Sequence, residues 1–220
     1  MTRTRIKICG LTRESDVDAA VAAGTDALGF VFYRRSKRAV DVGTAARLMA
    51  RVPPFVSKVA LFVNADENDV RECLARLPID VLQFHGDETP VDCARYGKPW
   101  IRAVRMASGV DLLEFCAAYQ NEPGFSGVLA DAHVDGYGGG GKRFDWTLLP
   151  RQRPLPLILS GGLTPDNVAE AIRIVRPYAV DVSSGVEESG EAGKGRKSAE
   201  RMERFIQEVR NADAGSLSLP

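Results

Sequence analysis

The 220-residue sequence carries no net charge, because 29 Lys and Arg residues are balanced by 29 Asp and Glu residues. A chain without net charge has no long-range field that would attract DNA, RNA or an anionic membrane. No apolar run approaches the roughly 18 residues of a membrane span, and the first residues enter a strand pattern without the apolar core of a signal peptide. We therefore expect a cytoplasmic protein whose partners are small molecules, with no nucleic acid and no membrane.

Patterns of metal-binding and disulfide-forming residues are also missing. The four cysteines are scattered without a CxxC pair, and the chain has two histidines, His85 and His133. Scattered cysteines are typical of proteins in a reducing compartment, and they do not fit a structural zinc site. The sequence therefore predicts free thiols and no structural zinc.

Short apolar segments alternate with helical patterns along almost the whole chain. The apolar segments lack a period of two, which is typical of parallel strands that are buried on both faces. Thr12, Thr164 and Ser198 are suitable caps for three of the helices. The expected strands are 5–9, 27–33, 57–63, 81–84, 100–104, 127–131, 155–160 and 179–182. The expected helices are 14–23, 44–51, 67–77, 89–96, 111–119, 145–149, 165–175 and 198–211.

Eight strand–helix units of similar length predict an α/β fold, a single (β/α)8 barrel of the TIM type over residues 1–211. A doubly wound open sheet is the alternative. It rarely needs eight near-equal units, however, and its Gly-x-Gly-x-x-Gly turn is missing after the first strand. We expect residues 212–220 to form a disordered tail. The oligomeric state is not fixed by the sequence; we expect a monomer, with a dimer as the alternative.

Two glycine-rich turns follow the last two expected strands. They consist of Ser160, Gly161 and Gly162 after the seventh strand, and of Ser183, Ser184 and Gly185 after the eighth. Backbone N–H groups in such turns form an anion site, and the last two strand-to-helix loops of a barrel commonly hold a phosphate. Isolated glycines often only tighten a turn. Two matched turns that both open with serine favour a phosphate site.

Three reactive side chains stand at expected strand ends, where barrels carry their function. Cys9 ends the first strand, and we expect its thiol to be open to solvent and substrate, with Lys7 pointing away from it. Asp131 ends the sixth strand and is either a loop anchor or a general acid, because burial favours the protonated carboxyl. Arg38 closes a basic loop, from which one guanidinium can clamp a carboxylate.

Other polar and glycine-rich segments near the strand ends have separate predicted roles. A glycine run, residues 138–141, follows the sixth strand and predicts a lid or another phosphate-contacting loop. Asp181 lies inside the eighth strand, where a buried carboxylate needs a partner, so we expect a structural role. We expect His133 to be a loop residue without a catalytic role. The fourth and fifth strands bring Gln83, His85, Arg102 and Arg105.

In this order, the motifs resemble the phosphoribosylanthranilate isomerase family of tryptophan biosynthesis. The resemblance covers almost the whole chain up to about residue 211. It is carried by Lys7-Ile8-Cys9-Gly10-Leu11-Thr12, Leu82-Gln83-Phe84-His85-Gly86, Tyr137-Gly138-Gly139-Gly140-Gly141-Lys142, Leu159-Ser160-Gly161-Gly162-Leu163 and Val180-Asp181-Val182-Ser183-Ser184-Gly185. It implies a (β/α)8 barrel that acts without a metal or cofactor.

The resemblance also implies a reaction and a role for each motif. The reaction is the Amadori rearrangement of N-(5-phosphoribosyl)anthranilate, an aminoaldose, to 1-(2-carboxyphenylamino)-1-deoxyribulose 5-phosphate. Asp131 would be the general acid that opens the ribose ring, Cys9 the general base at ribose C2, and Arg38 the group that holds the anthranilate carboxylate. The phosphate would lie against Gly139, Gly140, Gly141, Ser160, Gly161, Gly162, Ser183, Ser184 and Gly185. Gly140 stands where the family often has serine, which removes one hydroxyl from the phosphate loop.

Two other functions remain open at this point. Another phosphosugar barrel, such as a ribulose-phosphate epimerase, would usually need a metal held by several His and Asp residues, and this chain has two histidines. An inactive phosphate-binding barrel that serves as a regulator or scaffold is the second alternative. The presence of Cys9, Asp131 and Arg38 at three different strand ends speaks against it.

Overall fold

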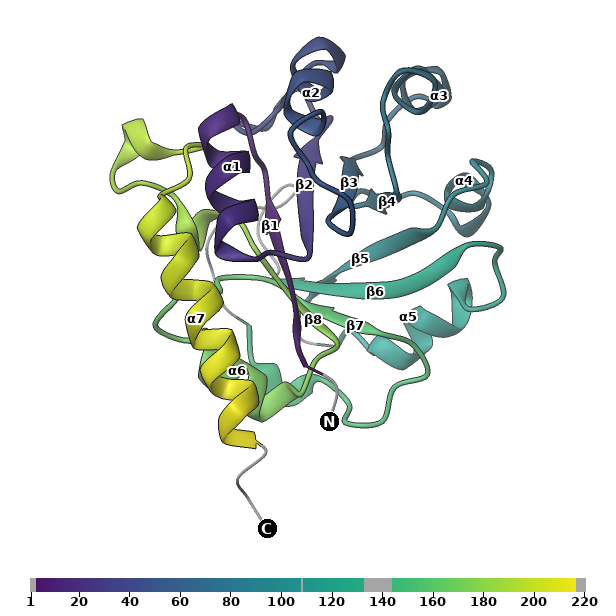
Figure 1. Ribbon diagram of the computed structural model, residues 1–220. Coiled ribbons are helices and arrows are strands. Elements are labelled where there is room, and N and C mark those ends of the chain that lie inside the picture. The colour runs from purple at the N-terminus through teal and green to yellow at the C-terminus, as the bar shows by residue number, and fades with distance from the viewer. Residues whose placement is uncertain (1–2, 108, 133–143, 217–220) are drawn as a thin grey trace.

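The strands close into a parallel barrel in the computed structural model, which describes residues 3–107, 109–132 and 144–216. They are β1 (Arg5–Cys9), β2 (Ala27–Val31), β3 (Ser57–Phe62), β4 (Val81–Phe84), β5 (Trp100–Met106), β6 (Phe125–Ala132), β7 (Leu157–Leu159) and β8 (Ala179–Val182). Each strand pairs in parallel with the next, and β8 returns to pair with β1. The predicted barrel is therefore confirmed (Figure 1).

Helices surround the barrel on the outside of the strands (Figure 1). The α-helices in the described residues are α1 (Glu14–Ala23), α2 (Val42–Met49), α3 (Glu67–Arg76), α4 (Pro90–Ala94), α5 (Leu112–Tyr119), α6 (Val168–Val175) and α7 (Ala199–Ser216). The short 3-10 helices are η1 (Trp146–Leu148), η2 (Ser184–Val186) and η3 (Glu191–Gly193). Between β6 and β7, the described residues carry η1 in place of a full helix. None of the described helices is long and apolar enough to cross a membrane.

Each strand presents alternate side chains to the helices and to the barrel interior. In β1, Ile6 and Ile8 belong to the main core beneath the helices, so Lys7 and Cys9 face inward. A second apolar layer fills the barrel interior with Ile101, Ala103, Leu129, Ile158 and Ala179. Because both faces of the strands are buried, the strands need apolar residues at nearly every position, which explains the missing alternation in the sequence.

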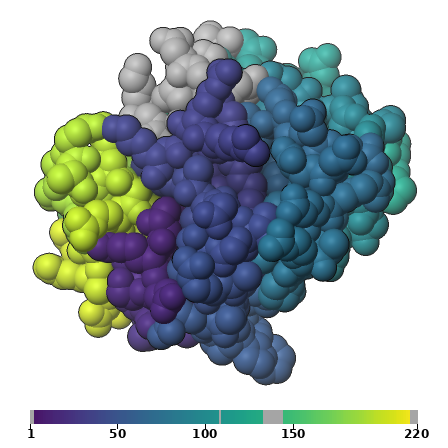
Figure 2. All heavy atoms as spheres, turned by 90° about the horizontal axis from the view of Figure 1, so that it is seen from above, coloured from purple at the N-terminus to yellow at the C-terminus, as the bar shows by residue number. Residues whose placement is uncertain are grey.

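The last helix is longer than the sequence predicts and joins the two ends of the chain. α7 runs to Ser216, beyond the expected end at residue 211. Asp213 accepts hydrogen bonds from the Thr4 backbone N and from Thr4 Oγ1, both at 2.7 Å. α7 also packs along α1, so the purple start and the yellow end of the chain lie side by side (Figure 2). The expectation of a disordered tail is wrong for residues 212–216, and residues 217–220 lie outside the described part.

Candidate active site

Cys9 ends β1 inside the barrel, where only 5% of its surface is exposed. Gly29 of β2 makes room for the thiol, since a Cβ at Gly29 would lie 2.6 Å from Cys9 Sγ. Burial raises the pKa of the Cys9 thiol above its ordinary value, while Lys7 acts in the opposite direction. The expectation of a thiol that is open to solvent is therefore wrong, because the barrel interior encloses Cys9.

The structure also corrects the orientation of Lys7. Residues two apart in a strand share a face, so Lys7 points into the barrel with Cys9 rather than away from it. Lys7 Nζ donates to Asp181 Oδ1 at 2.7 Å, and each side chain is 6% exposed. Burial alone would lower the pKa of Lys7, but Asp181 and then Cys9 outweigh it and raise the pKa. Asp181 thus has the partner that its burial requires, and Lys7 is a fixed cation beside the thiol.

Asp131 lies near the end of β6 and shares the inward face of Leu129. His85 Nε2 is 3.1 Å from Asp131 Oδ2, and Gln83 Nε2 is 3.0 Å from His85 Nδ1. The Gln83 amide and the Asp131 carboxyl therefore hold the His85 ring between them. The backbone N of Ala132 donates to Asp131 Oδ1 at 2.9 Å. The carboxyl is therefore held in one orientation. The sequence places Gln83 and His85 at a strand end, but it does not join them to Asp131.

The two serine–glycine turns after β7 and β8 pack directly on each other. A Cβ at Gly185 would lie 1.8 Å from the carbonyl oxygen of Leu163, so this close approach requires glycine. Gly161 has φ +84° and Gly162 has φ +64°, a region that favours glycine. A Cβ at Gly161 would also lie 2.5 Å from the backbone N of Ala132. The turn after β7 therefore adjoins the end of β6, beside the acidic side chain.

Serine hydroxyls tie these turns to the neighbouring strands. Ser160 Oγ donates to Asp181 Oδ2 at 3.4 Å, and Ser183 Oγ donates to the carbonyl oxygen of Cys9 at 3.0 Å. Ser184 begins η2. The predicted phosphate residues on β7 and β8 are thus brought together next to Cys9. The other predicted phosphate residues, Gly139, Gly140 and Gly141, lie outside the described residues, as does His133.

The Arg38 guanidinium forms a bidentate ion pair with the carboxylate of Glu187. Arg38 Nε donates to Glu187 Oε1 at 2.6 Å, and Nη2 donates to Glu187 Oε2 at 3.0 Å. A Cβ at Gly10 would lie 2.5 Å from Arg38 Cδ, so the glycine that follows Cys9 makes room for the arginine stem. Arg38 and Cys9 are therefore brought together by Gly10.

The sequence interpretation misses Glu187 and Lys197. Lys197 Nζ is fully buried and donates to Glu187 Oε1 at 3.1 Å and to the Ser183 carbonyl oxygen at 3.0 Å. Burial would raise the pKa of Glu187, but Arg38 and Lys197 lower it. Burial lowers the pKa of Lys197, and Glu187 opposes that effect. Both residues follow the β8 turn in the sequence, yet no spacing rule shows that they lie beside Arg38.

The two arginines of β5 face opposite sides of the barrel wall. Arg102 points out of the barrel and donates to the carbonyl oxygens of Phe84 at 3.1 Å and Gly86 at 2.9 Å. Arg105 donates to Asp87 at 2.6 Å in an exposed pair. Arg102 is therefore turned away from Cys9, whereas Arg105 lies opposite Asp131 in the register of β5 and β6, on the inward face that it shares with Ala103.

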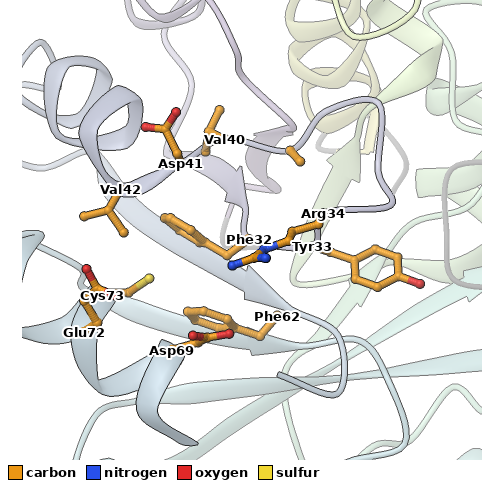
Figure 3. A pocket seen from close by; sticks show the side chains of 11 residues that line it. Phe32, Tyr33, Arg34, Val40, Asp41, Val42, Phe62, Asp69, Glu72 and Cys73 are labelled. Atoms are coloured by element: carbon orange, nitrogen blue, oxygen red, sulfur yellow. The ribbon is translucent and has the colours of Figure 1, made fainter. Parts of the chain in front are cut away.

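A separate cavity of about 340 Å³ lies on the helix side of the barrel wall (Figure 3). The Phe32 and Phe62 rings stack in it with centroids 5.4 Å apart, and Arg34 lies beside them. These rings alternate with Val31 and Leu61, which face the barrel interior. The cavity is therefore on the opposite side of the strands from Cys9.

Comparison with known proteins decides the family. The family model for N-(5'-phosphoribosyl)anthranilate (PRA) isomerase matches residues 6–208. The chain belongs to the PRA isomerase family. The N-(5'-phosphoribosyl)anthranilate isomerase of Leptothrix cholodnii is 55% identical over 215 residues, which are 98% of this chain and 94% of the relative. That of Dechloromonas aromatica is 56% identical over 211 residues, 96% of this chain and 98% of the relative.

Solved members of the PRA isomerase family share the whole barrel. The Thermotoga maritima enzyme superimposes with a TM-score of 0.84 at 39% identity, over 94% of this chain and 99% of that one. A member in complex with reduced 1-(o-carboxyphenylamino)-1-deoxyribulose 5-phosphate has a TM-score of 0.81 at 36% identity, with the same coverage of 94% and 99%. The similarity therefore extends over the strands that carry the site.

Proposed function

We propose that this chain converts N-(5-phosphoribosyl)anthranilate to 1-(2-carboxyphenylamino)-1-deoxyribulose 5-phosphate in tryptophan biosynthesis. The observation that carries the proposal is the pair of inward-facing groups, the Cys9 thiol and the Asp131 carboxyl, on β1 and β6 beside the two packed turns. Membership of the PRA isomerase family supports the same substrate. So does the deoxyribulose phosphate that is bound to one solved member.

Asp131 acts first, as the general acid. It donates a proton to the ribose ring oxygen, the C1–O bond breaks, and the nitrogen lone pair forms a protonated Schiff base with C1. The contacts from His85 and the Ala132 N–H hold the carboxyl in one orientation. A fixed donor beside the leaving oxygen is what general acid catalysis requires.

Cys9 acts second, as the general base. Its thiolate takes the proton from ribose C2, and the electrons of the C2–H bond form a C1–C2 double bond while the nitrogen becomes neutral. The resulting enolamine gains a proton at C1 and loses one from the C2 hydroxyl, which gives the ketone. One proton leaves C2 and one is added at C1, so the rearrangement needs no external oxidant or reductant.

Two anchors hold the substrate across the barrel mouth. The turns containing Gly161 and Gly185 offer backbone N–H groups to the phosphate, with Gly139, Gly140 and Gly141 as the third loop. Arg38 meets the anthranilate carboxylate at the other end. Because Glu187 takes the Nε and Nη2 edge of the guanidinium, we place the substrate carboxylate at the Nη1 side.

The proposal places the enzyme in the cytoplasm, where four free thiols are in keeping with a reducing compartment. It also takes the enzyme as a monomer, although a solved relative from Thermotoga maritima is described as dimeric. Phe55, a fully exposed aromatic residue, precedes β3 and lies at the opposite end of the barrel from the site. A dimer formed through Phe55 would therefore leave the barrel mouth accessible. Light scattering on the purified protein decides between monomer and dimer.

The direct test is the loss of phosphoribosylanthranilate fluorescence with purified protein and no added metal. We expect turnover that survives a chelator, and no epimerisation of ribulose 5-phosphate by the same sample. Failure to convert phosphoribosylanthranilate in a sample with an intact thermal unfolding transition would overturn the proposal. Such a sample would instead fit a phosphate-binding barrel without activity.

A further inference from the structure

The buried pair of Lys7 and Asp181 has no step in the acid–base sequence above, yet it lies directly beside Cys9. We propose that Lys7 is a positioning residue that holds a positive charge against the Cys9 thiol so that the buried thiol can ionise, while Asp181 limits how much of that charge Cys9 receives. This inference rests on the proposed role of Cys9 as the base.

The barrel geometry fixes the cation in place. Lys7 is directly opposite Asp181 in the register of β1 and β8, and Lys7 Nζ is 2.7 Å from Asp181 Oδ1. With 6% exposure on each side chain, neither group can turn into solvent without leaving the barrel interior. Cys9 follows two residues later on the same inward face. The ammonium is therefore shared between a carboxylate across the strands and a thiol along its own strand.

Among the residues that the structure describes, three charged groups act on Cys9 from the elements packed against it. They are Lys7 on β1, Asp181 on β8 and Lys197 before α7. From β2, Gly29 contributes no side chain. Lys197 is already held by the carboxylate of Glu187 at 3.1 Å. Lys7 is the cation that most strongly lowers the pKa of the thiol, against the larger raising effect of burial.

A purely structural pair would have a different effect. Two buried opposite charges cost desolvation energy, and an apolar pair of similar volume often stabilises a protein equally well. A nearby cation, by contrast, shifts the pKa of an acidic group by about one to three units. If Lys7 stabilises the Cys9 thiolate, removal of Lys7 must raise the pKa of the thiol and removal of Asp181 must lower it.

The test is the pH dependence of iodoacetamide alkylation at Cys9, read by peptide mapping of the folded full-length protein without substrate. In Lys7→Met we expect the midpoint of the alkylation profile to rise by about one unit or more. In Asp181→Asn we expect it to fall, because the ammonium then faces Cys9 without its carboxylate. Lys7→Arg, which keeps the charge, should restore most of the wild-type profile.

Lys58→Met is the matched control. Lys58 is an ion-paired lysine, 2.9 Å from Asp80, and it lies at the start of β3, at the opposite end of the barrel from the candidate site. Its alkylation profile and kcat/KM should match the wild type. An unchanged Cys9 profile in Lys7→Met, or shifts of the same sign in Lys7→Met and Asp181→Asn, would overturn the inference. If Lys7→Met does not fold, Lys7→Gln takes its place, because the fall in Asp181→Asn also follows from the loss of the carboxylate's own charge beside Cys9.

The alkylation readout separates this inference from the proposed function. If Cys9→Ser keeps full activity, the role of Cys9 as base fails, yet opposite shifts in the two charge variants would still establish that Lys7 controls the thiol. If Cys9→Ser is inactive and the shifts are absent, the base assignment stands and the role of Lys7 fails. The kcat/KM profile of Lys7→Met should move with the alkylation profile while KM changes little.

Discussion

Gly185 packs against the carbonyl oxygen of Leu163, so the turns after β7 and β8 touch through their backbones alone. A Cβ at Gly185 would lie 1.8 Å from that oxygen. Neither turn could hold its place if the other moved. The contact explains how two glycine-rich turns about twenty residues apart in the sequence come together, as the proposed phosphate site requires.

Gly185→Ala should therefore force the two turns apart. We expect KM for phosphoribosylanthranilate to rise at least tenfold and stability to fall by about 1–3 kcal/mol, the usual cost of overpacking. Steady-state kinetics and thermal unfolding measure the two effects. Gly215→Ala is the control, since a Cβ at Gly215 in α7 would meet nothing within 4 Å. A normal KM in Gly185→Ala would show that the packed turns do not bind the phosphate.

Arg38→Ala should chiefly weaken substrate binding. Loss of a charge-assisted contact with a carboxylate costs about 1.5–3 kcal/mol, which corresponds to a KM roughly ten- to a hundredfold higher. Arg35→Ala, an exposed residue of the same basic loop, should leave KM unchanged. Initial rates over a range of substrate concentrations separate KM from kcat. An effect confined to kcat would argue against a carboxylate clamp.

The residual activity of Asp131→Asn, in which the proposed acid no longer titrates, should rise with pH across the neutral range. The base must be deprotonated, and burial raises the pKa of Cys9, so the thiolate fraction grows as pH increases toward that raised value. Below the pKa of the thiol, kcat/KM should increase by up to tenfold per pH unit. A kcat/KM profile of Asp131→Asn that is flat or falls between pH 6 and about 8 would contradict a thiolate base.

Asp213→Ala should destabilise the fold, although the residue lies near the end of the described chain. The variant leaves Thr4 without the carboxylate that accepts from its backbone N and hydroxyl. Loss of such partners costs about 1–3 kcal/mol. Asp166→Ala, which removes an exposed pair with Arg204, should cost far less. Equal unfolding midpoints for the two variants would mean that the end of α7 does not secure β1.

The barrel was predictable because its strands are buried on both faces. Unalternating apolar runs such as 27–33, spaced at similar intervals, leave few other folds. The end of α7 was not predictable in the same way, because Ala212 and Asp213 read as polar, small-residue sequence. Ala212 is buried in the main core, and Asp213 pairs with Thr4, which is distant in the sequence.

The residues of the candidate site were predictable from the sequence, whereas the contacts between them were not. Cys9, Asp131 and Arg38 stand at strand ends, which a position rule can find. The contact of His85 with Asp131 and that of Glu187 with Arg38 join residues from different strands and loops. Such pairings follow from closure of the barrel, which brings distant segments to one mouth. The orientation of Lys7 could have been deduced, because a period of two places it on the same face as Cys9.

The central claim is that Cys9 and Asp131 are the base and the acid of one rearrangement. It is tested most directly by kcat for Cys9→Ser and Asp131→Asn on phosphoribosylanthranilate, beside their unfolding transitions. We predict that each variant loses about 10²- to 10⁴-fold in kcat while it unfolds at a temperature close to that of the wild type. Near-normal kcat in either folded variant would contradict the claim.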